Sequence, residues 1–166
     1  MPPPDEDAFR LRRQAALDHP CPFERALLAR CAACSRARTV LLAEREAIGC
    51  DAQAASERCH DFRDRLRAAS RFALRADPSA PWPFSKEIRL QCGGLIGLAV
   101  ALDEDEALDE GEALDDSEAP DDGAAATDAD ALIQRALQRF RDLDTLPWSR
   151  IIRAVIRHEP RRRAPR

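Results

Sequence analysis

The pattern of hydrophobic and polar positions along the 166 residues predicts a mainly α-helical protein. Apolar residues recur at steps of three and four, the spacing that collects them on one face of a helix. The clearest stripe lies in residues 147–158, where the apolar positions are Trp148, Ile151, Ile152, Val155 and Ile156. A second helix is expected over residues 128–143, so the C-terminal part predicts a helical pair over residues 127–158.

The first half of the chain predicts two further helices with an ambiguous segment between them. One helix runs from residue 23 to about residue 36, after the breakers Pro20 and Pro22, and the other over residues 51–76. Residues 38–50 fit either a continued helix, which we favour, or a hairpin that turns at Glu44 and Arg45. Fold class is therefore a small helical domain with a possible short β segment.

Residues 86–102 are the most apolar stretch. The alternation in residues 86–92 fits a short strand or a first helical turn, and residues 95–102 fit a short buried helix. Three glycines, Gly93, Gly94 and Gly97, lie in this stretch, and they indicate close approach of a neighbouring backbone. Residues 9–100 are thus expected to form one cysteine-containing helical domain.

Residues 101–126 contain three six-residue acidic repeats, whose period matches neither helix nor strand. Twelve acids and no base fall within residues 103–122, so a chain with a net charge of −4 carries +8 outside that stretch. Low hydrophobicity with high charge is typical of a solvated linker. We expect a linker here, with the C-terminal pair packing back on the first domain and residues 159–166 forming a basic tail.

The N-terminus has no export signal, and the longest apolar window, residues 95–102, is too short to span a bilayer. These features predict a cytoplasmic protein with no membrane partner. In a reducing compartment the six cysteines are expected to be metal ligands or free thiols rather than a disulfide framework.

Five of the six cysteines lie within 39 residues, and this crowding favours a metal site. We predict Cys31, Cys34, Cys50 and Cys59 as ligands, with Cys21, Cys92 and His60 as possible alternates. Thiolates bind both zinc and iron strongly, and the spacing offers one Cys-x2-Cys pair where zinc sites usually have two. An iron–sulfur cluster and zinc both remain open as cofactors, with a slight preference for the cluster.

The predicted ligand set makes a demand on the fold. In one straight helix Cys34 and Cys50 would lie about 24 Å apart, at 1.5 Å of rise per residue. They can share a metal only if the segment between them folds back. The alternative set of Cys21, Cys31, Cys34 and Cys92 makes no such demand.

The sequence contains no phosphate loop, nucleophile elbow, dinucleotide fingerprint or paired-histidine zinc motif, so we do not expect an enzyme. The main prediction is an accessory metal-binding protein. One alternative is an interaction adaptor that docks a protein partner through residues 147–158, with the cysteines packed in the core. The other is a thiol redox or sensor protein. A nucleic acid partner is not favoured, because no aromatic residues interleave the basic tail.

Overall fold

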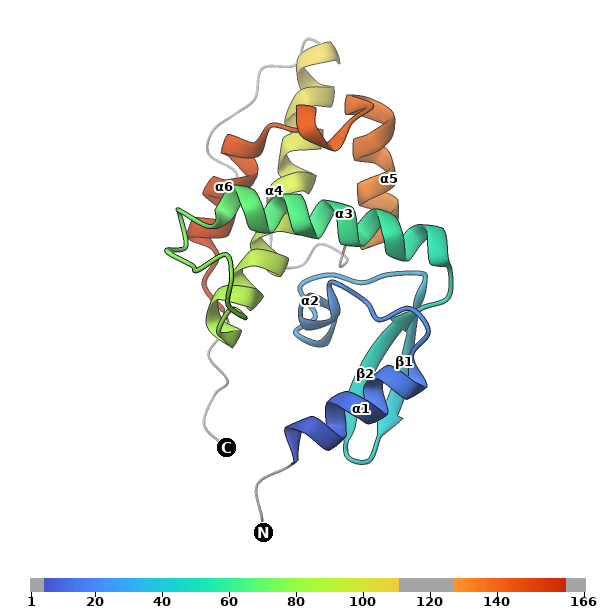
Figure 1. Ribbon diagram of the computed structural model, residues 1–166. Helices are drawn as coiled ribbons and strands as arrows, with labels where there is room; N and C mark the ends of the chain where they lie inside the picture. Colours follow the sequence, from blue (N-terminus) through green and yellow to red (C-terminus); the bar gives the residue numbers. More distant parts are fainter. Residues whose placement is uncertain (1–4, 111–126, 161–166) are drawn as a thin grey trace.

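The computed structural model describes residues 5–110 and 127–160, and it is mainly helical with one small antiparallel sheet (Figure 1). The elements in chain order are α1 (Glu6–Ala16), α2 (Glu24–Leu28), β1 (Ala37–Leu42), β2 (Arg45–Cys50), α3 (Gln53–Ser70), α4 (Phe84–Glu110), α5 (Ala129–Phe140), the 3₁₀ turn η1 (Leu143–Thr145) and α6 (Trp148–Arg157). None of the described helices is both long enough and apolar enough to cross a membrane. The predicted fold class is confirmed.

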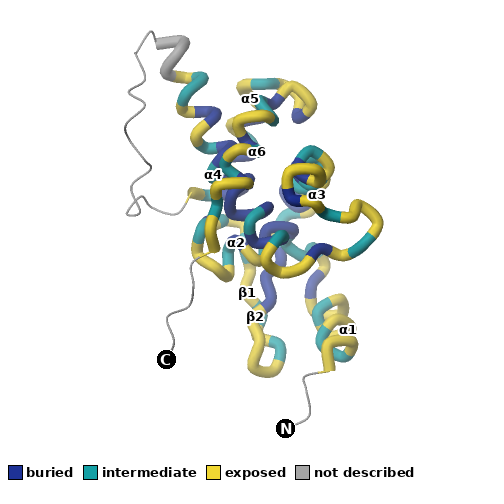
Figure 2. Tube along the Cα trace, turned by 90° about the vertical axis from the view of Figure 1, so that its left-hand side faces the viewer, coloured by how far each residue is buried: buried dark blue, intermediate teal, exposed yellow. Residues whose placement is uncertain are grey.

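The molecule has a helical part and a hairpin part. Helices α3, α4, α5 and α6 pack together, and α3 crosses in front of the others, while the hairpin with α1 and α2 lies beneath α3 (Figure 1). Buried residues concentrate where these helices meet, and the hairpin tip and α1 are mostly exposed (Figure 2). The largest fully buried side chains of the helical part are Phe62, Leu66, Leu98, Leu102, Leu132, Ile133, Ile151 and Val155.

Helices α4 and α6 make the closest helix–helix contact, and glycine makes it possible. A Cβ atom placed on Gly93 would lie 2.6 Å from the Cα of Val155, and one on Gly97 would lie 2.9 Å from the Cα of Ile151. Such separations are far inside van der Waals contact, so any side chain at these positions would force the helices apart. The close packing predicted from the glycines is confirmed.

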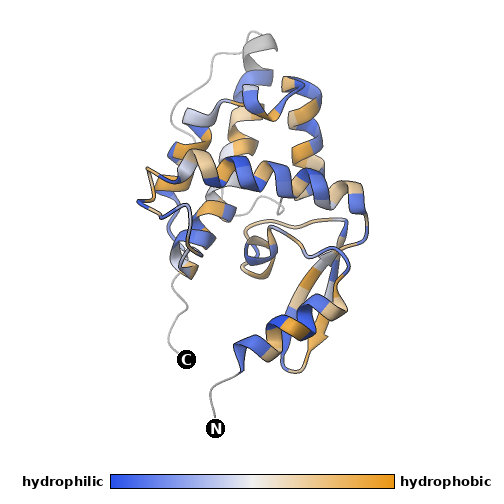
Figure 3. Cartoon of the chain, viewed as in Figure 1, coloured by the Kyte–Doolittle hydropathy of each residue, from blue (hydrophilic) through white to orange (hydrophobic). Residues whose placement is uncertain are grey.

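The predicted C-terminal helical pair is present as α5 and α6. Ile151 and Val155 are fully buried against α4, whereas Ile156 is 46% exposed. Hydrophobic and hydrophilic residues alternate along α6 (Figure 3). The apolar stripe of α6 therefore packs mainly against other helices of the same chain.

Two predicted elements of the first half are wrong. The favoured helix over residues 38–50 is instead the hairpin of β1 and β2, in which Ala37 pairs with Cys50 and Leu42 with Arg45. The helix expected over residues 23–36 is shortened to α2, because the backbone turns at Arg30, whose φ is +60°. The following loop instead pairs with the segment before α5, where the Ala129 N–H donates to the Ala33 carbonyl at 2.8 Å.

The linker begins later than predicted. Residues 101–110 continue helix α4, which replaces the separate short elements expected over residues 86–102. Arginines of the C-terminal helices pair with the acids: Arg135 reaches Glu106 at 3.0 Å, and Arg150 reaches Glu104 at 3.1 Å. Buried Leu102 anchors the same turn. The rest of the predicted linker, residues 111–126, and most of the basic tail, residues 161–166, lie outside the described residues.

Helix α1 is not among the helices expected from the sequence. Asp5 caps it by accepting hydrogen bonds from the N–H groups of Asp7 and Ala8 at 3.1 Å. The helix buries no residue of its own. It is held to the hairpin by Arg45, which lies over the Phe9 ring and pairs with Glu6. This explains why the pattern of buried positions gave no signal for it.

Candidate metal centre

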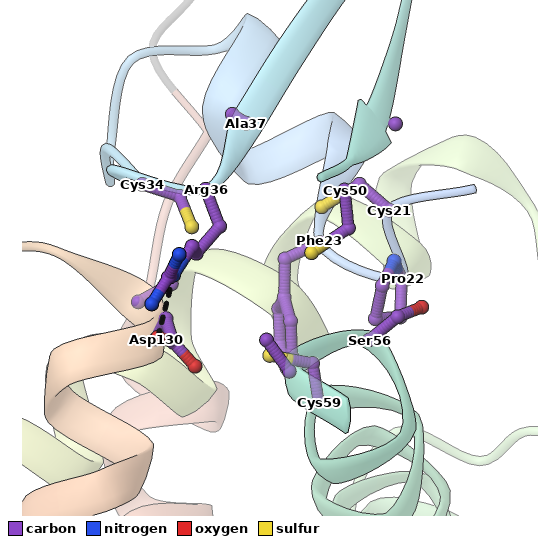
Figure 4. Close-up of a pocket in the computed structure, with 13 residues that line it drawn as sticks. Cys21, Pro22, Phe23, Cys34, Arg36, Ala37, Cys50, Ser56, Cys59 and Asp130 are labelled. Carbon is purple, nitrogen blue, oxygen red and sulfur yellow. Dashed lines mark ion pairs between the residues drawn. The ribbon is translucent and has the colours of Figure 1, made fainter. Parts of the chain in front are cut away.

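Four cysteines from four separate segments line one pocket between the hairpin and the helical part (Figure 4). Cys21 precedes α2, Cys34 precedes β1, Cys50 ends β2, and Cys59 lies in the second turn of α3. The fold-back that the sequence required is supplied by the hairpin, because its register brings the two ends of the 37–50 segment side by side. Cys34 and Cys50 thus reach the same pocket.

The predicted ligand residues divide between two places. Cys34, Cys50 and Cys59 share the pocket with the predicted alternate Cys21. Cys31 does not line it, because its sulfur is joined in a disulfide to that of Cys92, the other alternate. His60 is exposed and does not line it either; its Nε2 lies 3.3 Å from the Pro20 carbonyl.

Two of the thiols are already supplied with backbone donors that favour a thiolate. The N–H of Phe23 donates to the sulfur of Cys21, and the N–H of Arg36 donates to that of Cys34, each from two residues further along the chain. The N–H of Asp130, in the first turn of α5, also donates to Cys34. A helix N-terminus carries partial positive charge, so this contact also stabilises negative sulfur.

Burial opposes ionisation of these groups when they are thiols. Loss of solvation raises the pKa of Cys21 to about 12 and that of Cys59 to about 12, and burial also raises the pKa of Cys34. Neighbouring thiols add to the rise, since a second negative sulfur nearby would repel the first. Without a cation these side chains are neutral at pH 7, and binding of a cation would release their protons.

Cys50 has a different partner. Its thiol donates to the Ala52 carbonyl at 3.3 Å. A metal-bound thiolate cannot donate this hydrogen bond, so metal binding by Cys50 would require the bond to break.

One wall of the pocket is a buried ionic network. Asp130 is 3% exposed, and its carboxylate accepts from Arg58 at 2.9 Å and from Gln134 at 2.7 Å. Arg36, which also lines the pocket, lies 3.9 Å from Asp130. Arg36 lies on the side of the pocket where Cys34 lies (Figure 4), but the negative charge of Asp130 raises the pKa of both Cys34 and Cys59, so the network does not by itself favour thiolates.

The spacing of the sulfurs is wider than a single zinc ion needs. Four thiolates around one zinc, each at about 2.3 Å, lie about 3.8 Å from one another. Among the residues the structure describes, the group whose ligand atoms all fall within 4.8 Å of each other is Cys31, Cys92 and His158, so no three of the four pocket sulfurs meet that limit. The pocket also keeps a cavity of about 20 Å³, roughly room for one water molecule.

The crowding of cysteines in the sequence correctly indicated that Cys34, Cys50 and Cys59 belong to one site. It also favoured Cys31 as the fourth ligand, whereas the fourth cysteine of the pocket is Cys21. The Cys31-x2-Cys34 spacing suggested a shared face of one helix. The turn at Arg30 removes that helix, and the Pro20-Cys21-Pro22 segment is instead held against β2, where the N–H of Cys21 donates to the Ile48 carbonyl at 2.9 Å.

No family model, curated protein or solved structure matches this chain.

Proposed function

We propose that this protein is an accessory iron–sulfur protein whose cluster is held by Cys21, Cys34, Cys50 and Cys59. The observation that carries the proposal is the convergence of four cysteines, from four segments, on one pocket in which their sulfurs stand farther apart than around a single zinc ion. In a cluster the thiolates bind different iron atoms, so the ligand sulfurs stand farther apart than around one ion.

The surroundings support the same proposal. Backbone N–H groups donate to Cys21 and Cys34, and hydrogen bonds to sulfur are a common means of stabilising a bound cluster. The pocket is lined almost entirely by apolar atoms, with the Arg36, Arg58 and Asp130 network beside it. The cluster would join α3 and the hairpin, which make few other contacts with each other.

Metal binding at the cysteine pocket fits the chain better than docking of a protein partner through α6. The stripe of α6 that would serve an adaptor is largely buried against α4, with Ile151 and Val155 fully covered. Ile156 and the half-buried Trp148 would provide only a small apolar contact. We therefore place the cysteine pocket, rather than α6, at the centre of the function.

The test is anaerobic expression followed by analysis of iron, acid-labile sulfide and zinc, with a visible absorption spectrum. The full-length protein should be brown and contain iron and sulfide in similar amounts. Cys21→Ser and Cys50→Ser should each lose most of the colour. Cys31→Ser is the matched control, since it also removes one cysteine of the crowded segment but should keep the cluster.

Two outcomes would contradict the proposal. One is a colourless protein without sulfide in which Cys50→Ser binds one zinc fewer than the natural sequence, which would indicate a mononuclear zinc site in the pocket. The other is loss of the cluster in Cys31→Ser with retention in Cys21→Ser, which would favour the ligand set expected from the sequence.

A further inference from the structure

A second group of metal-ligating side chains lies apart from the four-cysteine pocket. It consists of Cys31, in the loop after α2, Cys92 in α4, and His158 at the C-terminal end of α6. Their ligand atoms all lie within 4.8 Å of one another, and none of the three residues lines the four-cysteine pocket. This group therefore needs an explanation of its own.

The imidazole of His158 lies beside two sulfurs and makes no hydrogen bond to any described residue. Its backbone is well fixed: the His158 N–H donates to the Ala154 carbonyl at 2.9 Å, and the Arg89 guanidinium donates to the carbonyl of Ile156. The ring is half-buried. A fixed imidazole with no other polar partner is available as a ligand.

The backbones that carry the group are held rigidly. Gly93 follows Cys92 directly, and it is the point where α4 touches the α6 backbone at Val155. The Cα atoms of Cys31 and Cys92 are 5.7 Å apart, a separation that suits a disulfide. Two thiolates that close, with one imidazole beside them, also form the nitrogen and sulfur donor set typical of zinc.

We propose that Cys31, Cys92 and His158 form a redox-dependent zinc site, which exists only when the disulfide is reduced. Two molecules of a low-molecular-weight thiol reduce the Cys31–Cys92 disulfide, and they leave as their own disulfide. Zn²⁺ then displaces the two thiol protons and binds both sulfurs and the imidazole. Three protein ligands leave one position of a tetrahedral zinc for water.

The reverse reaction uses a peroxide as the oxidant. The two zinc-bound thiolates each lose one electron and join as the disulfide, while hydrogen peroxide takes the two electrons, together with two protons from the solvent, and leaves as two water molecules. Zn²⁺ is released because a disulfide sulfur is a much poorer ligand than a thiolate. Each turn of this cycle exchanges one zinc ion for one disulfide.

The experiment measures bound zinc in the full-length protein, oxidised and reduced, after anaerobic removal of the reductant and titration with Zn²⁺ alone. Reduced protein should bind one zinc more than oxidised protein. His158→Ala should weaken that extra site more than about 100-fold, since loss of an indirect partner alone costs 10-fold to 100-fold. His60→Ala, which removes an exposed imidazole, is the matched control and should leave the extra site intact.

Peroxide added to the zinc-loaded protein should release one zinc as two thiols disappear. The same measurements in Cys50→Ser should show the same extra zinc, which separates this site from the four-cysteine pocket. Equal zinc binding by oxidised and reduced protein would overturn the proposal, as would full retention of the extra zinc in His158→Ala. Because His158 is half-buried, that variant remains informative even where Cys92→Ser fails to fold.

Discussion

The Cys31–Cys92 disulfide should contribute strongly to the stability of the oxidised protein, because it closes a long loop. The two residues are 61 positions apart in the sequence. A cross-link of that span removes about 4 kcal/mol of chain entropy from the unfolded state at 25 °C. Reduction is therefore expected to lower the free energy of unfolding by about 4 kcal/mol and the melting temperature by roughly 10 °C.

The assay is urea denaturation of the protein with and without a reductant. A zinc chelator is present throughout, so that zinc cannot replace the covalent link. Cys92→Ser is the control, because it cannot form the disulfide and should show no response to the reductant. A change below about 1 kcal/mol in the natural sequence, or an equal change in Cys92→Ser, would refute the reasoning.

Three further predictions concern packing, the hairpin turn and ionisation. Gly93→Ala places a Cβ 2.6 Å from the Cα of Val155, so it should lower the free energy of unfolding by about 1–3 kcal/mol in denaturation experiments, despite the better helix propensity of alanine. Ala43→Gly should raise it by about 1 kcal/mol, since Ala43 has a φ of +57° that glycine adopts without strain; an unchanged midpoint would contradict this. The metal-free protein should lose stability between about pH 9 and pH 12, because burial raises the pKa of Cys21 and Cys59 from 9.0 to about 12 and the unfolded chain releases those protons first; urea midpoints across that range, compared with Cys59→Ser, would test it.

The hairpin was hard to predict because its turn carries no turn signal. A two-residue hairpin loop usually contains glycine, asparagine or aspartate, which tolerate a positive φ. Here Ala43 and Glu44 occupy the loop, and both are good helix formers. Local propensity therefore favoured a helix, and the pairing of β1 with β2 outweighed it.

The acidic end of α4 was missed for a related reason. Residues 103–106 are all acids, and in isolation they would repel one another. Arg135 and Arg150 come from the C-terminal helices, more than 28 residues away, and they supply the opposite charges. No pattern within the acidic segment itself could have indicated that these two arginines would lie beside it.

The sequence by itself determined the helical class, the apolar stripe of α6, the close approach at the glycines, and the crowding of cysteines. These features depend on local spacing, which is written directly in the chain. The tertiary structure alone decided that Cys21 joins Cys34, Cys50 and Cys59, and that Cys31 lies with Cys92 and His158. The reason is that those partnerships join segments up to 127 residues apart, and their distances are set by the turn at Arg30 and by the packing of α4 against α6.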